Sequence, residues 1–325
     1  NMDHMELGDM GSGCEDENCG HASGFPEDLC VTVIYIPLML FGLLGNILTI
    51  LVVWLRPHMR SSTYLYLSSM AVSDLLILLL LPLDLYKLWR PRPWPLGELA
   101  CKLTMFLSEC CTFCTILHIT FLSLERYLAV CWPITAKTLV TRRRTRALIG
   151  CLWLGAAVSA APFLVMVGVE EVGGEELGEC RCTHYAVSSG LLSAMMVVSN
   201  LYFLVPLCIL GLVYSLIGRT LWLRPQSSRR DQSHRHTVKM LGVIVLAFVL
   251  CWLPFHVGRT IFSISLGSSS DRQEYLNLVS SVLFYLSAAI NPLLYNLMSA
   301  RYRHAVHRTP YRGEHFPRPS NCNTD

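Results

Sequence analysis

Ionisable side chains stand within the long apolar stretches of this 325-residue chain, where burying a charge is costly. Asp84 and Glu109 are acids near one end of these stretches, and Arg259 is a base at the same end. An acid and a base that face one cavity can pair, which lowers the cost of burying either. A ligand with an amino group could then take the Glu109 carboxylate as its counter-ion. The sequence therefore predicts a ligand site made by Asp84, Glu109, Arg259, Phe255 and His256.

The chain lacks the residue groupings that an enzyme would need. A hydrolase uses a Ser/His/Asp or a two-Asp arrangement, and no nucleophile is placed beside His118 or His256. A retinal-binding pump needs a Lys in its last helix, whereas Tyr275–Met298 contains neither Lys nor an acid. The 14 cysteines do not have the spacing of a zinc site. We expect no enzyme and no structural metal, and a seven-helix transporter or proton-conducting protein is the alternative from another class.

Seven apolar blocks hold these side chains. Hydrophobic residues make up 53% of the chain and charged residues 15%, whereas globular proteins carry about 25% charged residues. A helix that crosses a bilayer needs about 20 apolar residues. The blocks that meet this length are Val31–Leu55, Tyr64–Leu88, Lys102–Val130, Leu148–Val169, Ser188–Leu216, Val238–Ile264 and Tyr275–Met298. They predict an all-α membrane protein, a bundle of seven transmembrane helices.

Basic residues collect on one side of these blocks. When the loops are assigned alternately to two sides, 19 of the 26 Lys and Arg fall on one side and 7 on the other. Basic loops mark the cytoplasmic side of membrane proteins, and the first 30 residues contain eight acids and no Lys or Arg. We expect a multi-pass plasma-membrane protein with its N-terminus extracellular, whose basic patches report topology and not nucleic-acid binding. The chain begins with Asn1 instead of Met, which suggests a fragment.

This topology divides the chain into three segments. Residues 1–30 are expected to form an extracellular N-terminal segment, 31–298 the seven-transmembrane domain, and 299–325 a cytoplasmic short helix and tail. In the last segment Tyr302 and Val306 are four residues apart among basic neighbours, which suits a short amphipathic eighth helix on the inner membrane face. The polar stretch Pro225–Ser228 is expected to be a turn that joins two helices extended into the cytoplasm.

One residue pattern in each block resembles the rhodopsin-like G-protein-coupled receptors. In chain order the patterns are Asn46 in GNIL, Asp74 in SSMAVSDLL, Glu125-Arg126-Tyr127, Trp153, Pro206 with Tyr214, Cys251-Trp252-Leu253-Pro254 and Asn291-Pro292-Leu293-Leu294-Tyr295. A single one of these patterns would carry little weight. All seven in order, each inside its own block, are specific.

The resemblance implies a sodium site and an activation switch. Asn46, Asp74 and Asn291 match the family's resting-state sodium site, so we expect a sodium ion at Asp74 as the sole cofactor; a purely structural polar cluster is the alternative. Glu125 would hold the Arg126 guanidinium until it is released toward Tyr214 and a heterotrimeric G protein. The implied switch residues are Glu125, Arg126, Tyr127, Tyr214, Phe248, Trp252, Asn291, Pro292 and Tyr295.

The resemblance also implies one disulfide, between Cys101 and Cys180. It would pin the second outer loop over the ligand cavity. Cys182 lies two residues from Cys180 and competes for the same partner in principle. Otherwise Cys182 could pair with Cys14, Cys19 or Cys30, or stay free.

Longer strings resemble the ghrelin and motilin receptor branch of peptide receptors: LPLDLYKLWRPRPW, YSLIGR, HTVKML, CWLPFHVGR and FYLSAAINPLLYN. Within this branch LHITFLSLERYLAV, VTRRRTRALI and MAVSDLLIL are more similar to motilin receptors. The second outer loop, Glu170–Ala186, is short, as in ghrelin (growth hormone secretagogue) receptors. We expect a motilin-type receptor, with a ghrelin receptor as the alternative. The resemblance implies a peptide agonist held between Glu109 and Arg259, and signalling mainly through Gq/11 to calcium.

Overall fold

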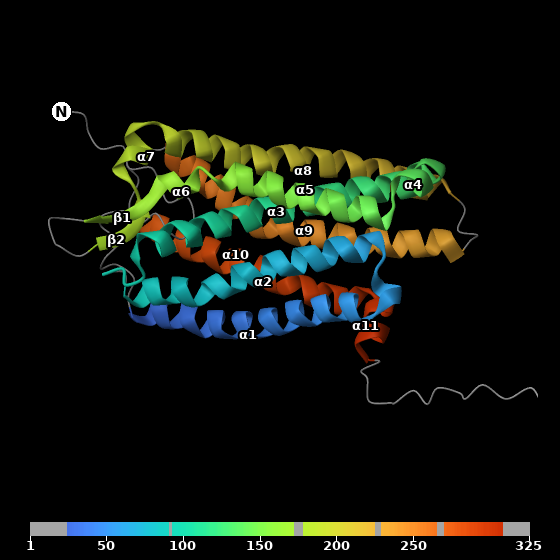
Figure 1. The fold of residues 1–325 in the computed structure, drawn as a ribbon, viewed down its shortest axis with the longest axis horizontal. Coiled ribbons are helices and arrows are strands. Elements are labelled where there is room, and N and C mark those ends of the chain that lie inside the picture. The colour runs from blue at the N-terminus through green and yellow to red at the C-terminus, as the bar shows by residue number, and fades with distance from the viewer. Residues whose placement is uncertain (1–24, 91–92, 172–177, 225–228, 265–269, 308–325) are drawn as a thin grey trace, which may run out of the picture.

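Long helices that run side by side make up most of the computed structural model (Figure 1). The structure describes residues 25–90, 93–171, 178–224, 229–264 and 270–307. The side chains of residues 258–277, 295, 296 and 298 are not part of this description. The predicted turn at Pro225–Ser228 and the tail beyond His307 lie outside the described residues.

Seven of the helices span the length of the bundle: α1 (Phe25–Leu55), α2 (Ser62–Trp89), α3 (Gly97–Cys131), α5 (Arg142–Ala160), α8 (Leu191–Leu223), α9 (Arg229–Ile264) and α10 (Ser270–Met298). Six of them, α5 taken with its continuation to Met166, are long and apolar enough to cross a bilayer. In the described part of α10, Leu278–Leu294 is a shorter apolar stretch. The seven-helix membrane fold expected from the apolar blocks is confirmed.

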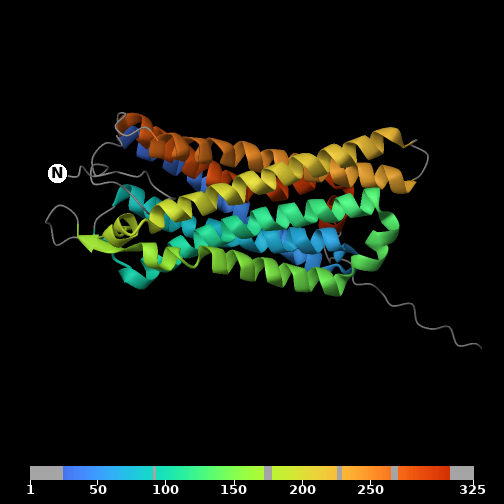
Figure 2. The ribbon, with the colours of Figure 1, turned by 90° about the horizontal axis from the view of Figure 1, so that it is seen from above.

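Short elements gather at the two ends of this bundle (Figures 1 and 2). One end carries α6 (Phe163–Met166), the strands β1 (Val167–Glu171) and β2 (Gly178–Cys182), and α7 (His184–Ser188); we call it the hairpin end. The other carries the 3-10 turn η1 (Pro57–Met59), α4 (Pro133–Leu139) and α11 (Ala300–His307); we call it the α11 end. The strands pair antiparallel, with Val169 opposite Cys180.

The fourth and fifth helices differ from their predicted bounds. The apolar block Leu148–Val169 predicted one helix, but α5 ends at Ala160, just before Pro162, and the chain is a strand from Val167. Proline cannot donate the hydrogen bond that would continue a helix, and pairing with β2 satisfies the backbone beyond it. The fifth helix begins at Leu191 and not at Ser188, because Gly190 adopts a left-handed conformation (φ 76°) that separates it from α7.

Two glycines allow α1 to approach its neighbours closely. A Cβ atom at Gly42 would lie 2.6 Å from Leu78 Cδ1 of α2, and a Cβ atom at Gly45 would lie 2.8 Å from Pro292 Cβ of α10. Both distances are shorter than van der Waals contact. A side chain at Gly42 would displace the end of the Leu78 side chain, whereas one at Gly45 would meet the rigid Pro292 ring and push α1 away from α10. Gly45 therefore explains how Pro292, a predicted switch residue, packs directly against the α1 backbone.

The short helix α11 is anchored to the bundle by polar contacts, which confirms the expected eighth helix. Ser299 Oγ accepts a hydrogen bond from the Tyr302 backbone N (3.1 Å) and lies 2.7 Å from the Tyr64 hydroxyl. The Tyr302 hydroxyl lies 3.0 Å from Thr49 Oγ1 of α1. Burial raises the pKa of the Tyr302 phenol, so this hydroxyl is neutral at physiological pH and can share a proton with Thr49.

Arginine side chains cap the carbonyl ends of five helices at the α11 end. Each guanidinium donates to a main-chain carbonyl at or near a helix C-terminus, where unpaired carbonyls and the helix dipole favour a cation. The pairs are Arg60 with Trp54 of α1, Arg224 with Val130 of α3 (2.7 Å), Arg144 with Thr138 and Leu139 of α4 (3.0 and 3.3 Å), Arg235 with Leu221 of α8 (2.5 Å) and Arg303 with Leu297 of α10 (2.9 Å). These contacts hold the loops against the ends of the helices.

Candidate functional site

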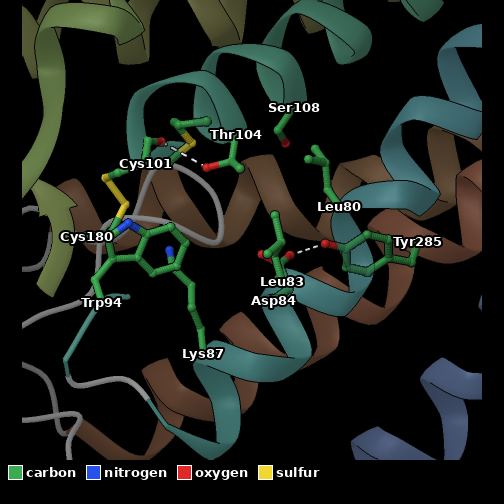
Figure 3. Close-up of a pocket in the computed structure, with 11 residues that line it drawn as sticks. Leu80, Leu83, Asp84, Lys87, Trp94, Cys101, Thr104, Ser108, Cys180 and Tyr285 are labelled. Carbon is green, nitrogen blue, oxygen red and sulfur yellow. Dashed lines mark hydrogen bonds between the residues drawn. A yellow bond between two sulfur atoms is a disulfide. The ribbon is translucent and has the colours of Figure 1, made fainter. Parts of the chain in front are cut away.

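A cavity opens at the hairpin end between α2, α3 and α10 (Figure 3). Asp84 of α2 points into it and accepts a hydrogen bond from the Tyr285 hydroxyl of α10. The residues that line it are Leu80, Leu83, Asp84, Lys87, Trp94, Cys101, Thr104, Met105, Ser108, Cys180 and Tyr285. This wall combines a carboxylate, an ammonium group and hydroxyls with aromatic surface, which suits a ligand that is both charged and apolar.

Lys87 and Trp94 form the outer wall of this cavity. The Lys87 ammonium lies 5.3 Å from the centroid of the Trp94 ring, within the range of a cation–π contact. Trp94 is positioned by two hydrogen bonds, from its backbone N to the Gly178 carbonyl (2.9 Å) and from its indole N to the Gly97 carbonyl (2.8 Å). Trp94 therefore joins the start of α3, through its indole, to the hairpin, through its backbone, and its ring presents one face to Lys87.

Glu109 lies one turn of α3 deeper than Met105. It is buried, with 7% of its surface exposed, and it does not line the cavity described above. The backbone of Arg259 is part of α9, but its side chain is outside the described part of the chain. The predicted pair of Glu109 with Arg259 therefore stays a prediction, and so does the placement of both groups around one ligand.

Phe255 and His256 of α9 pack within the bundle. The His256 ring stacks on Phe203 of α8 (centroids 4.5 Å apart), and its Nδ1 lies 3.2 Å from Asn200 Oδ1. The Phe255 ring meets Trp252 edge to face at 5.6 Å. Phe255 is partly exposed whereas His256 is buried. These contacts connect the predicted ligand residues of α9 directly to the predicted switch residue Trp252.

The predicted disulfide between Cys101 and Cys180 is confirmed, with Cα atoms 5.7 Å apart. It joins α3 to β2, so the hairpin is held over the cavity (Figure 3). Cys182 is also disulfide-bonded, whereas Cys30 is free. This excludes two of the predicted alternatives, a free Cys182 and a bond to Cys30; the remaining predicted partners lie outside the described residues.

A second cavity lies midway along the bundle, around Asp74. Asp74 is almost fully buried, and its carboxylate accepts a hydrogen bond from Asn291 Nδ2 (3.1 Å). Hydroxyl and amide oxygens line this cavity beside the ring of Trp252; its residues are Asp74, Ile77, Thr112, Thr115, Ile119, Phe248, Trp252, Ser287, Ile290 and Asn291. A carboxylate with several neutral oxygen donors is a fitting donor set for a small hard cation.

Asn46 does not belong to this cavity lining. Its side-chain Nδ2 donates to the Gly42 carbonyl (2.8 Å) and to the Ala288 carbonyl of α10 (3.0 Å). Its Oδ1 is buried without a hydrogen-bond partner among the described residues. Asn46 thus joins α1 to α10, and the structure gives it no direct hydrogen bond to the Asp74 carboxylate.

A chain of buried hydrogen bonds, which we call the polar relay, joins α2, α3 and α5 beside the Asp74 cavity. The Trp153 indole N donates to Ser69 Oγ (2.8 Å), which lies 2.8 Å from His118 Nε2. The His118 Nδ1 lies 2.7 Å from the Cys114 carbonyl, so Nδ1 carries the proton and Nε2 accepts from Ser69. The expectation that no nucleophile lies beside His118 is wrong, because the Ser69 hydroxyl and the Cys114 thiol (3.4 Å) both contact its ring. The Ser69 hydroxyl is buried between Trp153 and His118, so the polar relay accounts for all three as residues that join the helices.

Arg126 at the α11 end is paired with its neighbour. Its Nη2 lies 3.3 Å from Glu125 Oε1, and the same carboxylate accepts a hydrogen bond from Ser62 of α2. The Arg126 Nε is buried without a partner among the described residues. The ion pair of Arg126 with Glu125 is the contact expected for the resting state, and the release of the guanidinium on activation stays a prediction.

The other predicted switch residues lie between the two cavities and the α11 end. Tyr214 lies 3.1 Å from Ser123 Oγ of α3. Trp252 contacts Phe248 (ring centroids 5.9 Å apart) and meets Phe284 of α10 edge to face at 5.2 Å. The Tyr127 hydroxyl accepts a bond from the Trp132 indole (3.3 Å). The Tyr295 side chain is outside the described part, so its role stays a prediction.

Three contributors to these sites were not predicted. Tyr285 binds Asp84, Lys87 covers Trp94, and Ser62 binds Glu125. Lys87 is charged and falls in an apolar block, a signal that could have identified it. Tyr285 and Ser62 carry no such signal, because a tyrosine or a serine in a membrane helix is common and its partner lies far away in the sequence.

Comparison with known proteins agrees with this geometry. The family model described as 7 transmembrane receptor (rhodopsin family) matches residues 45–295. The growth hormone secretagogue receptor type 1 of Sus scrofa is 54% identical over 297 residues, covering 87% of this chain and 81% of that receptor. The human receptor of the same name is 53% identical, again over 87% of this chain. The human motilin receptor is 43% identical over 348 residues, covering 90% of this chain and 83% of that receptor.

The chain therefore belongs to the rhodopsin family of seven-transmembrane receptors, and it is not an enzyme. Within this family its relatives include the growth hormone secretagogue and motilin receptors, which confirms the predicted branch. It is a multi-pass plasma-membrane receptor for a peptide ligand that acts through a G protein.

The comparisons correct the expectation of a motilin-type receptor, because they favour the predicted alternative. The strings that suggested a motilin receptor span residues 70–78, 117–130 and 140–149. They lie in the middle of the bundle and at the α11 end, away from the hairpin and its cavity. Similarity there reports on helix packing and on the α11 end, and carries little information about a ligand bound at the hairpin end. The short loop that bears the hairpin was the more relevant signal.

Proposed function

We propose that this chain is a receptor for a peptide of the ghrelin type, with its hairpin end extracellular and its α11 end cytoplasmic. The observation that carries the proposal is its 53–54% identity to growth hormone secretagogue receptors across 87% of the chain, against 43% to the motilin receptor. The excess of Lys and Arg in the loops at the α11 end supports this orientation.

In this proposal the amino end of the peptide enters the cavity at the hairpin end. Asp84 and Glu109 would offer carboxylates to its cationic groups, the Arg259 guanidinium would donate hydrogen bonds to its carbonyls, and Phe255 would contact its apolar part. His256 would act through its contact with Phe203 and Trp252. Acids of the hairpin such as Glu171, which is exposed, would attract the basic remainder of the peptide.

The cytoplasmic step is assigned to Arg126. Agonist binding would move Trp252 and Phe248, shift α9, and release the guanidinium from Glu125 toward Tyr214 and the G protein. Coupling is proposed to be mainly to Gq/11, so that the downstream signal is a rise in cytosolic calcium. Asn291, Pro292 and Tyr295 would complete this path along α10.

A calcium assay in transfected cells tests the proposal. Ghrelin, unacylated ghrelin and motilin are applied in parallel, with untransfected cells as the control. We expect a calcium response to ghrelin at concentrations at least tenfold lower than for motilin. A stronger response to motilin would reverse the assignment, and no response to any of the three would overturn the ligand class. Blocking Gq/11 should abolish the response if the coupling is as proposed.

We further propose that the central cavity holds a sodium ion in the resting receptor. The buried Asp74 carboxylate and the oxygens of Thr115, Ser287 and Asn291 provide the donors. Raising sodium at constant ionic strength, with potassium as the replacement ion, should lower agonist affinity in the wild-type receptor. Asp74→Asn should remove this dependence, and an equal sodium effect in the variant would refute the site.

A further inference from the structure

Cys182 of β2 forms a disulfide whose partner is not among the described cysteines. Cys182 is disulfide-bonded, whereas Cys101 and Cys180 are bonded to each other. The other described cysteines are free, namely Cys30, Cys110, Cys111, Cys114, Cys131, Cys151, Cys208 and Cys251. The sequence holds 14 cysteines. The candidates that remain within this chain are Cys14, Cys19 and Cys322.

The compartment in which each candidate lies decides among these three. In the proposed orientation the hairpin end is extracellular, where disulfides form and persist, whereas the cytoplasm keeps thiols reduced. Cys322 follows α11, so it would have to cross the bilayer with the charged stretch after His307 to reach β2. Such a crossing would place charges and unpaired backbone groups in the apolar core, which is costly. Cys14 and Cys19 therefore remain.

Both of these cysteines can reach β2 from the start of α1. Phe25 begins α1 at the hairpin end of the bundle (Figure 1). Cys19 precedes Phe25 by six residues and Cys14 precedes it by eleven, which allow at most about 20 and 40 Å of extended chain. The disulfide itself adds about 5–6 Å. Because α2 packs between α1 and α3, the gap from α1 to α3 is about two helix diameters, or about 20–24 Å.

The side chain of Cys182 lies on the same side of β2 as that of Cys180. Side chains two residues apart on a strand point to the same face, and Cys180 lines the cavity that the hairpin covers. Cys182 also packs against the buried cluster that contains Trp94 and Cys101. A disulfide at Cys182 therefore leads its partner segment to the cavity side of the hairpin.

We propose that Cys182 forms a disulfide with Cys14 or Cys19, which ties the N-terminal segment to the hairpin. The strand β2 is then attached on two sides, to α3 through Cys180 and to the chain that leads into α1 through Cys182. Two thiols become one disulfide, and the two electrons and two protons that they lose convert a disulfide of a secretory-pathway oxidant into two thiols. Because Cys182 is partly exposed whereas Cys180 is buried, a reductant reaches the Cys182 bond first. The inference rests on the proposed orientation and not on the identity of the peptide.

Peptide mapping of the purified receptor, alkylated without reduction, tests this bond directly. Trypsin cleaves after Arg181 and so separates Cys182 from Cys180. Cleavage after glutamate separates Cys14 from Cys19, because two glutamates lie between them. We expect the peptide of Cys182 to be joined to the peptide of one of these two cysteines. An alkylated Cys182 thiol, or a bond from it to any other cysteine, would overturn the proposal.

A cleavable tag tests the same bond on intact cells. The receptor carries an epitope tag before Asn1 and a protease site inserted between Ser23 and Gly24, so cleavage separates the tagged segment from α1. In the wild type the tag should stay on the receptor after cleavage and leave when dithiothreitol is added. C182S should lose the tag without reductant. C14S/C19S defines complete release, since it leaves no cysteine before the cleavage site.

C30S is the matched control, because Cys30 is an exposed, free cysteine close to the same segment. It should keep the tag as the wild type does. Release of the tag from the wild type without reductant, or its retention in C182S, would refute the bond. A tag that the protease reaches only after the cells are permeabilised would overturn the orientation on which the inference rests. These readouts use no peptide agonist, so their failure is distinct from a failure of the proposed ligand.

Discussion

Glu109 is the predicted ligand residue whose position the structure changes most. Sequence reasoning placed it in one cavity with Asp84, whereas the structure buries it next to Ser108, which lines the cavity, without giving Glu109 a place in the lining. A buried carboxylate is costly unless it is paired, and in the proposed ligand site Glu109 would be the deepest acid that the peptide reaches. Its charge should therefore matter more for peptide binding than for folding.

The first prediction is that Glu109→Gln lowers peptide potency by about 10- to 100-fold while surface expression persists. The estimate corresponds to the loss of one buried hydrogen bond to a charged group, about 1.5–3 kcal/mol. Calcium dose–response curves and antibody staining of intact cells measure the two quantities. Glu98→Gln is the control, since Glu98 is an exposed glutamate of the same helix, paired with Lys102 (3.3 Å). Unchanged potency in Glu109→Gln would remove Glu109 from the ligand site.

At the scale of elements, the hairpin depends on its disulfide for its position. Two short strands are marginal by themselves, and the bond from Cys180 to Cys101 joins them to the first turns of α3 across 79 residues of chain. Trp94 adds a second attachment through its bond to Gly178. The hairpin therefore covers the cavity only while the disulfide and the Trp94–Gly178 hydrogen bond hold it in place.

Cys101→Ser should lose at least tenfold in peptide affinity and unfold at a lower temperature. Removing a disulfide that closes a long loop costs about 3–5 kcal/mol. Radioligand binding and a thermal unfolding scan of the purified receptor test the two effects. Cys208→Ser changes an exposed, free cysteine of α8 and should leave both values as in the wild type. Wild-type affinity in Cys101→Ser would show that the bridge is not needed for the site.

The α11 ends of α8 and α9 are held together by arginine contacts. Arg235 of α9 donates to the carbonyls of Leu221 (2.5 Å) and Arg224 (3.1 Å), and Arg224 donates to Val130 of α3 (2.7 Å). These bonds join α9, the helix that would move in the proposed activation, to α8 and α3. They should therefore favour the resting arrangement.

Arg235→Ala is expected to raise agonist-independent signalling roughly fivefold, the shift that follows if the contact contributes about 1 kcal/mol. Inositol phosphate accumulation without peptide, normalised to surface receptor, measures it. Arg230→Ala removes a neighbouring exposed arginine and should leave the basal signal unchanged. A basal signal in Arg235→Ala that matches the wild type would show that the contact does not restrain α9.

At the scale of the whole molecule, the proposed function places ligand binding and G-protein activation at opposite ends of the bundle. Arg126 follows Glu109 by 17 residues, about 25 Å along α3 at about 1.5 Å per residue. Between them lie the Asp74 cavity and the ring of Trp252. A mutation at the α11 end should therefore be able to abolish G-protein activation while peptide binding is retained.

Arg126→Ala should bind peptide within about threefold of the wild-type affinity and yet give no calcium response, because it lacks the guanidinium that meets the G protein. Binding to membranes and calcium release from the same cells provide the comparison. Arg219→Ala, which changes an exposed arginine near the same end of α8, is the control. Normal calcium release in Arg126→Ala would disprove the switch assignment.

Much of this arrangement could be predicted from the sequence because it depends on local patterns. Apolar blocks of sufficient length predict membrane helices, and charges within them, such as Asp74 and Arg126, identify the polar centres. The hairpin could not be predicted, because its strands are short and rich in Glu and Gly, and the apolar block before it continues past Pro162. Tyr285 was missed for a different reason, since its partner Asp84 is 201 residues away. Contacts of that kind depend on how helices pack and leave no mark in either segment.

The arginines that cap the helices at the α11 end serve a second purpose during synthesis of the protein. Membrane insertion reads only their positive charge, which favours the cytoplasmic side for basic loops and so agrees with the proposed orientation. Capping uses the N–H donors of the guanidinium at close range, as Arg144 Nη1 does with the Thr138 and Leu139 carbonyls. A lysine would satisfy the first requirement, but its ammonium group is more strongly hydrated than a guanidinium and would lose more hydration on contact with the carbonyls. Biogenesis and the finished fold therefore place different demands on the same five residues, and arginine meets both.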